Sequence, residues 1–117
     1  MRRGELVTIA LQGDFGKLRP ALIVQSDLFN AEHATLSVLP ITSEIIDTPI
    51  FRITLEPSAT NGLRKVSQIM VDKIVSVKRE KVSEPFGRLE EEAMLRVNRA
   101  LAFWLGGVIC ASITQAK

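Results

Sequence analysis

The chain has 117 residues, of which 46% are hydrophobic and 24% charged, and its formal net charge is +2. This composition excludes a disordered or fibrous chain, and the length suits one domain, residues 1–117, that buries a core of its own. The small net charge does not by itself indicate a nucleic-acid partner, although basic residues cluster locally.

Short strands are predicted over the first three quarters of the chain. The predicted strands are residues 5–11, 21–26, 35–42, 50–56 and 66–77. Residues 50–56 alternate apolar and polar side chains, as a half-buried strand does. Pro40 indicates a bend or an edge position, because proline cannot donate to a ladder. In the longest predicted strand, 66–77, a bend is expected near Lys73.

Between the second and third strands, residues 26–33 predict a short helix that Ser26 or Asp27 could cap. His33 is the only histidine, and we expect it to be a partly exposed residue at the end of this helix. A metal or catalytic role would need partners that the sequence does not place nearby.

The last quarter of the chain changes period and predicts one amphipathic helix, "RLEEEAMLRVNRALAFWLGG". Its first turn holds three glutamates, which the helix dipole favours, and the glycine pair Gly106–Gly107 supplies a stop. The apolar stripe, which includes Trp104, is assigned to the core. Together, short strands and one terminal helix predict a mainly β fold: a small, strongly bent antiparallel sheet or barrel. The connections are too short for parallel βαβ units.

The C-terminal end is the most apolar part of the chain. Residues 101–113 are fewer than the ~20 needed for a membrane-spanning helix, and we predict no membrane segment. The single cysteine, Cys110, excludes an internal disulfide and is typical of a reducing environment. With no signal peptide evident at the N-terminus, we expect a cytoplasmic protein.

Motifs for metal, nucleotide and acyl-transfer chemistry are missing from the sequence. It contains no CxxC, HExxH, P-loop or GxGxxG pattern, and we therefore expect no metal and no cofactor. Polar residues at predicted strand ends remain: Arg19 before Pro20, Thr42 followed by Ser43, and Asp72 followed by Lys73. An arginine fork beside a hydroxyl would bind phosphate oxygens. The alternative is a surface ion pair at Arg19 and a strand end at Thr42.

The chain resembles the MazF/PemK toxins of bacterial toxin–antitoxin systems from Gly4 to about Gly106. The segments that carry the resemblance are "RGELVTIAL", "KLRPALIVQSDLFN", "LPITSE", "GLRKVSQIMVDKIVSV" and "GRLEEEAMLRVNRAL". The most specific part is "RPALIVQSD" followed by "PITS". The resemblance implies an SH3-like β barrel with short helices, a homodimer that cleaves single-stranded RNA, and a MazE-like antitoxin that blocks it with a disordered acidic tail.

The resemblance also implies site residues. The family's catalytic arginine falls on Arg19, its hydroxyl partner on Thr42, and the aspartate that some members use on Asp72. The expected reaction needs no metal, because RNA carries its own nucleophile, the 2′-hydroxyl; it would leave a 2′,3′-cyclic phosphate and a 5′-hydroxyl. The candidates for RNA binding are Lys17, Ser43, Arg64, Lys65 and Lys73. The first loop, "QGDFGK", lacks the histidine of some members, and Val75 stands where others have arginine.

Two alternatives remain open at this point. One is a CcdB-like toxin, which uses the same barrel to bind DNA gyrase without chemistry and in which a C-terminal helix with an exposed tryptophan would be central. The other is an inactive relative that only binds an antitoxin. The apolar residues 108–117 could either contribute to a dimer contact or pack back on the barrel.

Overall fold

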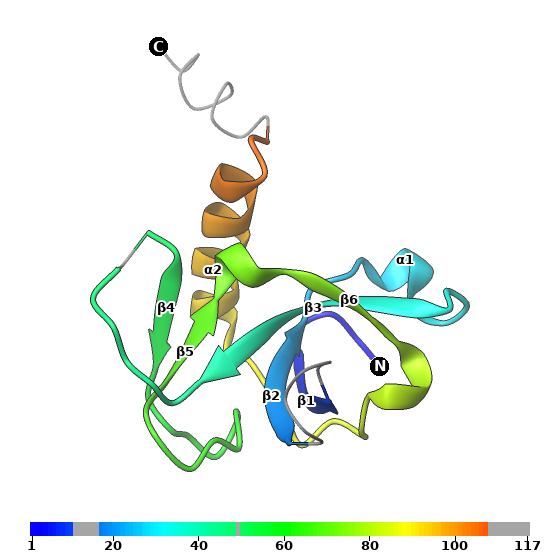
Figure 1. The fold of residues 1–117 in the computed structure, drawn as a ribbon, viewed down its shortest axis with the longest axis horizontal. Coiled ribbons are helices and arrows are strands. Elements are labelled where there is room, and N and C mark those ends of the chain that lie inside the picture. The colour runs from blue at the N-terminus through cyan, green and yellow to red at the C-terminus, as the bar shows by residue number, and fades with distance from the viewer. Residues whose placement is uncertain (11–16, 49, 108–117) are drawn as a thin grey trace.

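A computed structural model describes residues 1–10, 17–48 and 50–107, and shows an antiparallel sheet curled into a half-barrel with one main helix at the C-terminal end (Figure 1). The strands are β1 (Glu5–Ala10), β2 (Leu18–Ile23), β3 (Thr35–Thr42), β4 (Arg52–Leu55), β5 (Ser67–Met70), β6 (Val75–Lys78) and β7 (Gly87–Arg88). The helices are α1 (Asp27–Asn30), α2 (Glu91–Trp104) and the 3₁₀ turns η1 (Val71–Lys73) and η2 (Arg79–Lys81). The predicted mainly β class with one C-terminal amphipathic helix is confirmed.

The strands follow the spatial order β4-β5-β3-β2-β1-β7, and β6 also pairs with β3. Both faces of the central strands are buried. Leu6, Leu22 and Leu39 face one core with residues of α2, whereas Val7, Ala21 and Val38 face a second core inside the curl of the sheet. A strand that is buried on both faces has no polar side to show. This explains the continuous apolar run at the start of the second predicted strand.

The predicted strand 66–77 is corrected to two strands. Ile41 of β3 lies opposite Ile69, but Val38 lies opposite Val75. The segment that pairs with β3 therefore holds extra residues between these two positions. These residues form η1, which ends at Lys73, where the bend was expected. Pro40 sits between the segments of β3 that pair with β5 and β6, where the missing N–H costs no ladder bond on that side.

The first helix is shorter than predicted and ends at Asn30. The Ser26 hydroxyl accepts a hydrogen bond from the Leu28 N–H at 3.2 Å, which confirms Ser26 as the cap. His33 is exposed, but it lies beyond the helix and not at its end, where it was expected. The second predicted strand begins earlier than expected, at Leu18, so that Arg19 and Pro20 belong to β2 itself.

The terminal helix packs on the sheet through Ala93 and Val97, and Gly106 follows it with a φ of 71°. The prediction that its whole apolar stripe is core is wrong at the C-terminal end. Phe103 and Trp104 are 58% and 44% exposed. Trp104, the last residue of α2, meets Phe51 edge to face with ring centroids 5.2 Å apart. Figure 1 shows that α2 runs past the end of the sheet, so its last turn has little to pack against.

None of the helices within residues 1–10, 17–48 and 50–107 is long and apolar enough to cross a membrane. The first loop, Cys110 and the apolar tail 108–117 lie outside the described residues.

Candidate functional site

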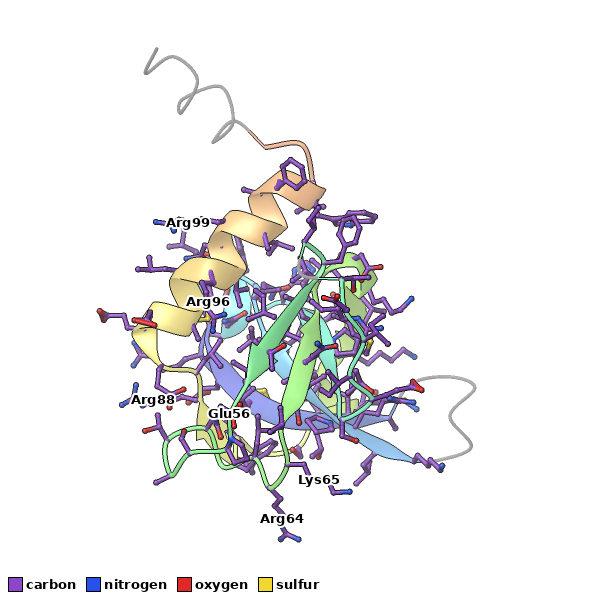
Figure 2. All side chains as sticks on the ribbon, turned by 90° about the vertical axis from the view of Figure 1, so that its left-hand side faces the viewer. Glu56, Arg64, Lys65, Arg88, Arg96 and Arg99 are labelled. Carbon is purple, nitrogen blue, oxygen red and sulfur yellow. The ribbon has the colours of Figure 1, made fainter. Side chains whose placement is uncertain are left out.

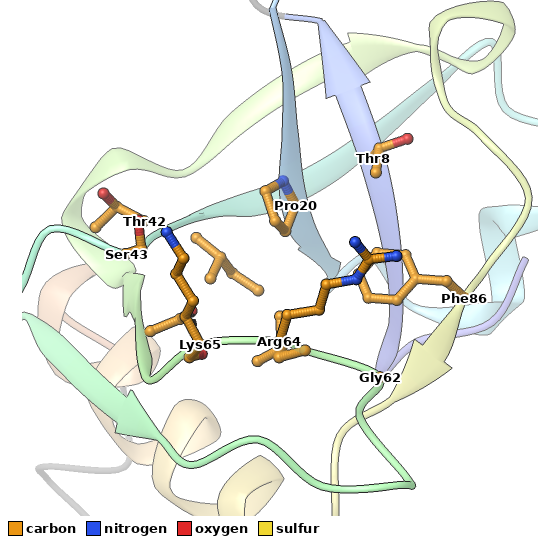
Figure 3. Close-up of a pocket in the computed structure, with 11 residues that line it drawn as sticks. Thr8, Pro20, Thr42, Ser43, Gly62, Arg64, Lys65 and Phe86 are labelled. Carbon is orange, nitrogen blue, oxygen red and sulfur yellow. Dashed lines mark hydrogen bonds between the residues drawn. The ribbon is translucent and has the colours of Figure 1, made fainter.

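A cavity of about 450 Å³ opens where the ends of β2 and β3 meet the segment that leads into β5 (Figure 3). Its lining combines apolar side chains, hydroxyl groups and two cations. The lining residues are Thr8, Pro20, Ile41, Thr42, Ser43, Gly62, Leu63, Arg64, Lys65, Ser67 and Phe86. A cavity with this mixture can hold a ligand that carries both negative charge and an apolar surface.

Four of the residues predicted from the sequence meet in this cavity: Thr42, Ser43, Arg64 and Lys65. Figure 3 shows Lys65 extending on the side of Thr42 and Ser43, and Arg64 extending on the side of Phe86. Both cations are exposed and project from the lower edge of the molecule in Figure 2. Exposed lysine and arginine side chains on one rim can bind phosphates in a salt-dependent manner.

The hydroxyl group of Thr42 is held by the turn that follows β3. Its Oγ1 accepts a hydrogen bond from the Glu44 N–H at 3.1 Å. Gln68, opposite Thr42 in the ladder, is buried and binds both backbone groups of Ile46 at 3.1 and 3.0 Å. Because Thr42 Oγ1 acts as an acceptor here, its own proton can be donated to a ligand.

The segment that carries Arg64 and Lys65 is fixed by Asn61, which is 1% exposed. The Asn61 side-chain oxygen accepts bonds from the N–H groups of Ser58 and Leu63 at 3.0 and 2.9 Å, and its amide donates to the Glu56 carbonyl at 2.9 Å. A buried amide bonded in this way holds the loop in one conformation. The two cations therefore project from a preorganised backbone.

Arg19 is the second residue of β2, opposite Ile9 of β1, and is half-buried. It does not line the cavity, but its neighbour Pro20 does. The pairing of β2 with β3 ends at Ala21 opposite Pro40, and Arg19 and Thr42 each lie two residues further on at this end. Because side chains alternate along strands, both lie on the face of the second core. The strands therefore bring Arg19 and Thr42 to the same end and face of the sheet.

Besides Arg19, three further predicted site residues are not part of the cavity lining. Lys17 is exposed immediately before β2 and is not part of the lining. Asp72 and Lys73 lie in η1, beyond the C-terminal end of β5, whereas Ser67 at the other end of β5 lines the cavity. One carboxylate oxygen of Asp72, Oδ1, is buried and has no hydrogen-bond partner among the described residues.

Sequence reasoning missed several lining residues, of which Phe86 and Gly62 matter most. Phe86 is 40% exposed, and its ring stands at the cavity in Figure 3. An aromatic residue between Pro85 and Gly87, in a segment with no strand or helix pattern, was the available signal. Metal ligands were not expected, and within the described ranges no group of three or more His, Cys, Asp or Glu side chains gathers as a metal site would.

Comparisons with known proteins agree with this architecture. A family model described as "PemK-like, MazF-like toxin of type II toxin-antitoxin system" matches residues 2–105. The chain is 44% identical over 107 residues to "Probable endoribonuclease MazF" of Mycolicibacterium smegmatis, covering 91% of this chain and 97% of that protein. It is 32% identical over 111 residues to "Endoribonuclease MazF" of Staphylococcus saprophyticus, covering 91% and 92%.

Solved structures show the same fold. A mycobacterial endoribonuclease in complex with its cognate antitoxin superposes with a TM-score of 0.77 at 22% identity, covering 91% of this chain and 95% of that one. A MazE–MazF structure from Deinococcus radiodurans gives 0.74 at 25% identity, covering 92% and 97%. The half-barrel with a cationic cavity at its strand ends is thus the fold of a small toxin domain. The chain belongs to the PemK/MazF family of type II toxin–antitoxin toxins.

Proposed function

We propose that this chain is the toxin of a type II toxin–antitoxin pair and an endoribonuclease that cleaves single-stranded RNA without a metal ion. One observation carries the proposal: β2 and β3 bring Arg19 and Thr42 to the same strand end, where Thr42 and Ser43 meet Arg64 and Lys65 in one cavity. Relatives that match over more than 90% of both chains are named endoribonucleases.

In the proposed reaction, the 2′-oxygen of a ribose attacks the adjacent phosphorus and the 5′-oxygen of the next nucleotide leaves. Arg19 stabilises the charge on the non-bridging oxygens and donates the proton to the leaving oxygen. Thr42 donates to the phosphate and fixes its rotation. The 2′-hydroxyl proton goes to a base, for which the resemblance suggests Arg19, although a guanidinium very rarely loses its proton. Asp72 matches the aspartate that some members of the family use, and its part in the reaction is a separate question. The products are a 2′,3′-cyclic phosphate and a 5′-hydroxyl.

RNA binding is proposed to depend on the cations around the strand ends. Arg64 and Lys65 are the first candidates, because the buried Asn61 fixes their loop beside Thr42. Ser43 lies in the same cavity and can donate to a phosphate oxygen. Lys17 and Lys73 lie outside the cavity lining and would contact nucleotides further along the strand. Each such contact makes the affinity depend on salt.

The partners follow from the same proposal. A MazF of Deinococcus radiodurans and a mycobacterial endoribonuclease have been solved with their antitoxins. We propose that this chain forms a homodimer in the cytoplasm and is blocked there by a MazE-like antitoxin with an acidic C-terminal tail. Such a tail would compete for the cationic rim at Arg64 and Lys65.

The CcdB-like alternative is not favoured, because the family model and the relatives are PemK/MazF toxins and endoribonucleases. The position of Trp104 does not decide between the two, since this residue is half exposed at the end of α2. The other alternative, an inactive relative that only binds an antitoxin, is distinguished from an active toxin by an RNA cleavage assay.

The test is to incubate the purified protein with a long RNA in excess EDTA and to map the new 5′ ends. We expect cleavage at a short recurring sequence, with 5′-hydroxyl and cyclic phosphate termini. Arg19→Ala protein, purified in the same way, controls for contaminating ribonuclease. Cleavage that stops with chelator and returns with Mg²⁺ would contradict the metal-independent reaction, and intact RNA under all conditions would contradict the enzyme.

A further inference from the structure

We infer that Phe86 is a base-stacking residue that holds a nucleobase of the RNA in the cavity and contributes to sequence preference. The inference rests on the proposed function, because it names which part of the substrate the cavity receives. It goes beyond that function because it assigns a role to Phe86. The sequence pattern around Phe86 predicted no such role, and the phosphate chemistry does not need one.

The cavity holds more apolar surface than a phosphate needs. Pro20 and Ile41 lie on the β2 and β3 side of the lining, and Leu63 and Phe86 complete it from two other segments. Apolar side chains add nothing to phosphate binding, whereas a nucleobase is planar, largely apolar on its faces and attached to phosphates on both sides. The lining therefore fits a nucleotide unit, with the base inside and the phosphates at the cationic rim.

The backbone that carries Phe86 is fixed on both sides. The Phe86 N–H donates to the Leu6 carbonyl at 2.9 Å, which extends the pairing of β7 with β1. The Arg88 N–H donates to the Thr60 carbonyl at 2.9 Å, which joins the same segment to the loop that carries Arg64 and Lys65. The backbone segment that carries the aromatic ring is therefore joined by a hydrogen bond to the loop that carries the two cations.

Two glycines allow this close approach. A Cβ on Gly62, whose φ is +70°, would lie 2.8 Å from the Phe86 carbonyl oxygen and 3.0 Å from its ring carbon Cδ1. A Cβ on Gly87 would lie 2.3 Å from the Asn61 carbonyl oxygen. The missing side chains let the backbone pack directly against the edge of the ring.

Phe86 nevertheless remains 40% exposed. A ring that is held in place but left open to solvent loses little conformational entropy when a ligand stacks on it. Figure 3 shows Arg64 extending on the side of this ring and Lys65 on the side of Thr42, so both cations flank the proposed base site. This is the arrangement of single-strand binding sites, in which an aromatic platform lies beside a positively charged path for the backbone.

The probes for the test are four uncleavable RNA nonamers, the 2′-O-methylated homopolymers of U, C, A and G, and an abasic 2′-O-methyl ribose-phosphate nonamer. Affinities are measured for the wild type, Phe86→Leu, Phe86→Trp and the control Phe103→Leu, which removes an exposed phenylalanine on α2. A nonamer with 2-aminopurine at its centre reports stacking through loss of fluorescence.

We expect the wild type to prefer at least one base over the others. Phe86→Leu should bind that homopolymer about 5- to 150-fold more weakly, the loss of one stacked base, and should lose the preference. Phe86→Trp and Phe103→Leu should keep it, and the abasic strand should bind Phe86→Leu and the wild type equally. Quenching of 2-aminopurine should be weaker with Phe86→Leu than with the wild type.

The inference is overturned if Phe86→Leu keeps the affinity, base preference and quenching of the wild type, or if the abasic strand binds the wild type as tightly as every homopolymer. Two measurements still test the inference if Phe86→Leu does not fold. One compares the homopolymers with the abasic strand on the wild type, and the other is the base preference of Phe86→Trp. A wild type that binds and cleaves natural RNA while these results fail would leave the proposed function intact. A wild type that neither binds nor cleaves RNA would refute the function itself.

Discussion

Arg19 of β2 and Thr42 of β3 lie at the same end and on the same face of two neighbouring strands, each two residues beyond the last pairing, Ala21 with Pro40. They are far apart in sequence, and the antiparallel register alone brings them together. Only Thr42 also lines the cavity with Arg64 and Lys65. Arg19 lies outside the lining, so its contact with the scissile phosphate stays a prediction, and the rim cations reach the cavity from the loop before β5.

Removing Arg19 should abolish most of the cleavage without unfolding the protein. Arg19→Ala is expected to lower the rate by roughly 10²–10³, the cost of losing one preorganised donor to a developing negative charge. Arg19→Lys should fail as well, because one ammonium cannot replace the planar fork. Single-turnover cleavage and thermal unfolding measure the two effects. Arg88→Ala, which removes an exposed arginine from β7, is the matched control. Normal cleavage by Arg19→Ala would refute the assignment.

The rim cations should act on binding and not on the chemical step. Replacing Arg64 and Lys65 by alanine should weaken RNA binding at low salt. It should also reduce the slope of log affinity against log salt by about 0.7 for each lost phosphate contact. Titrations of an uncleavable RNA at several salt concentrations measure this. Lys78→Ala, an exposed change on β6, should leave the slope unchanged. An unchanged slope in the double variant would move the RNA path elsewhere.

Asp72→Asn separates a role in the reaction from a structural role. Its Oδ1 is buried and has no hydrogen-bond partner among the described residues. We therefore expect the Asp72→Asn protein to unfold at the same temperature as the wild type or higher. If Asp72 takes part in the reaction, its cleavage rate should fall about tenfold or more. A fall in Tm with an unchanged rate would show that Asp72 is structural. The cavity residue Ser43, changed to alanine, gives the comparison for a binding defect alone.

An antitoxin tail and RNA should exclude each other at the cationic rim. An acidic, flexible peptide can wrap this surface, and its binding should weaken as salt rises. The measurement is a competition titration, in which an antitoxin peptide is added to a complex of the toxin with labelled, uncleavable RNA. Displacement supports a shared surface. A ternary complex with undiminished RNA affinity would place inhibition at a remote site.

Stability should depend on Asp27 in acid. The Arg3 backbone N–H donates to Asp27 Oδ1 at 2.7 Å and, together with Asn30 and the positive charges of Arg2 and Arg3, holds the pKa of this carboxyl below its usual value of 3.8. A lowered folded-state pKa stabilises the protein above the unfolded value, and this contribution is lost as the pH falls through the folded value. Asp27→Ala should therefore lower Tm at pH 7, and by much less in acid well below the usual value of 3.8. An equal loss at both pH values would contradict the linkage.

The sequence by itself determined the class of the fold and most of its elements. Alternation over 52–55, the apolar run at 21–24 and the helical period after Leu89 depend on local patterns that tertiary packing did not override. The end of the third strand at Thr42 was also predictable, whereas Arg19, expected just before its strand, lies within β2. The division of 66–77 into two strands by η1 was not predictable from local pattern. It depends on the register with β3, whose residues lie far away in the chain.

Tertiary structure alone decided which of these side chains meet. Local pattern could not show that Phe86 lies against Gly62, because that contact depends on two glycines whose missing side chains let two loops touch. Nor could it show that Asp72 and Lys73 lie beyond the far end of β5, or that Trp104 is exposed where α2 runs past the sheet. Periodicity reports which side of an element is apolar, whereas burial depends on where the neighbouring element ends.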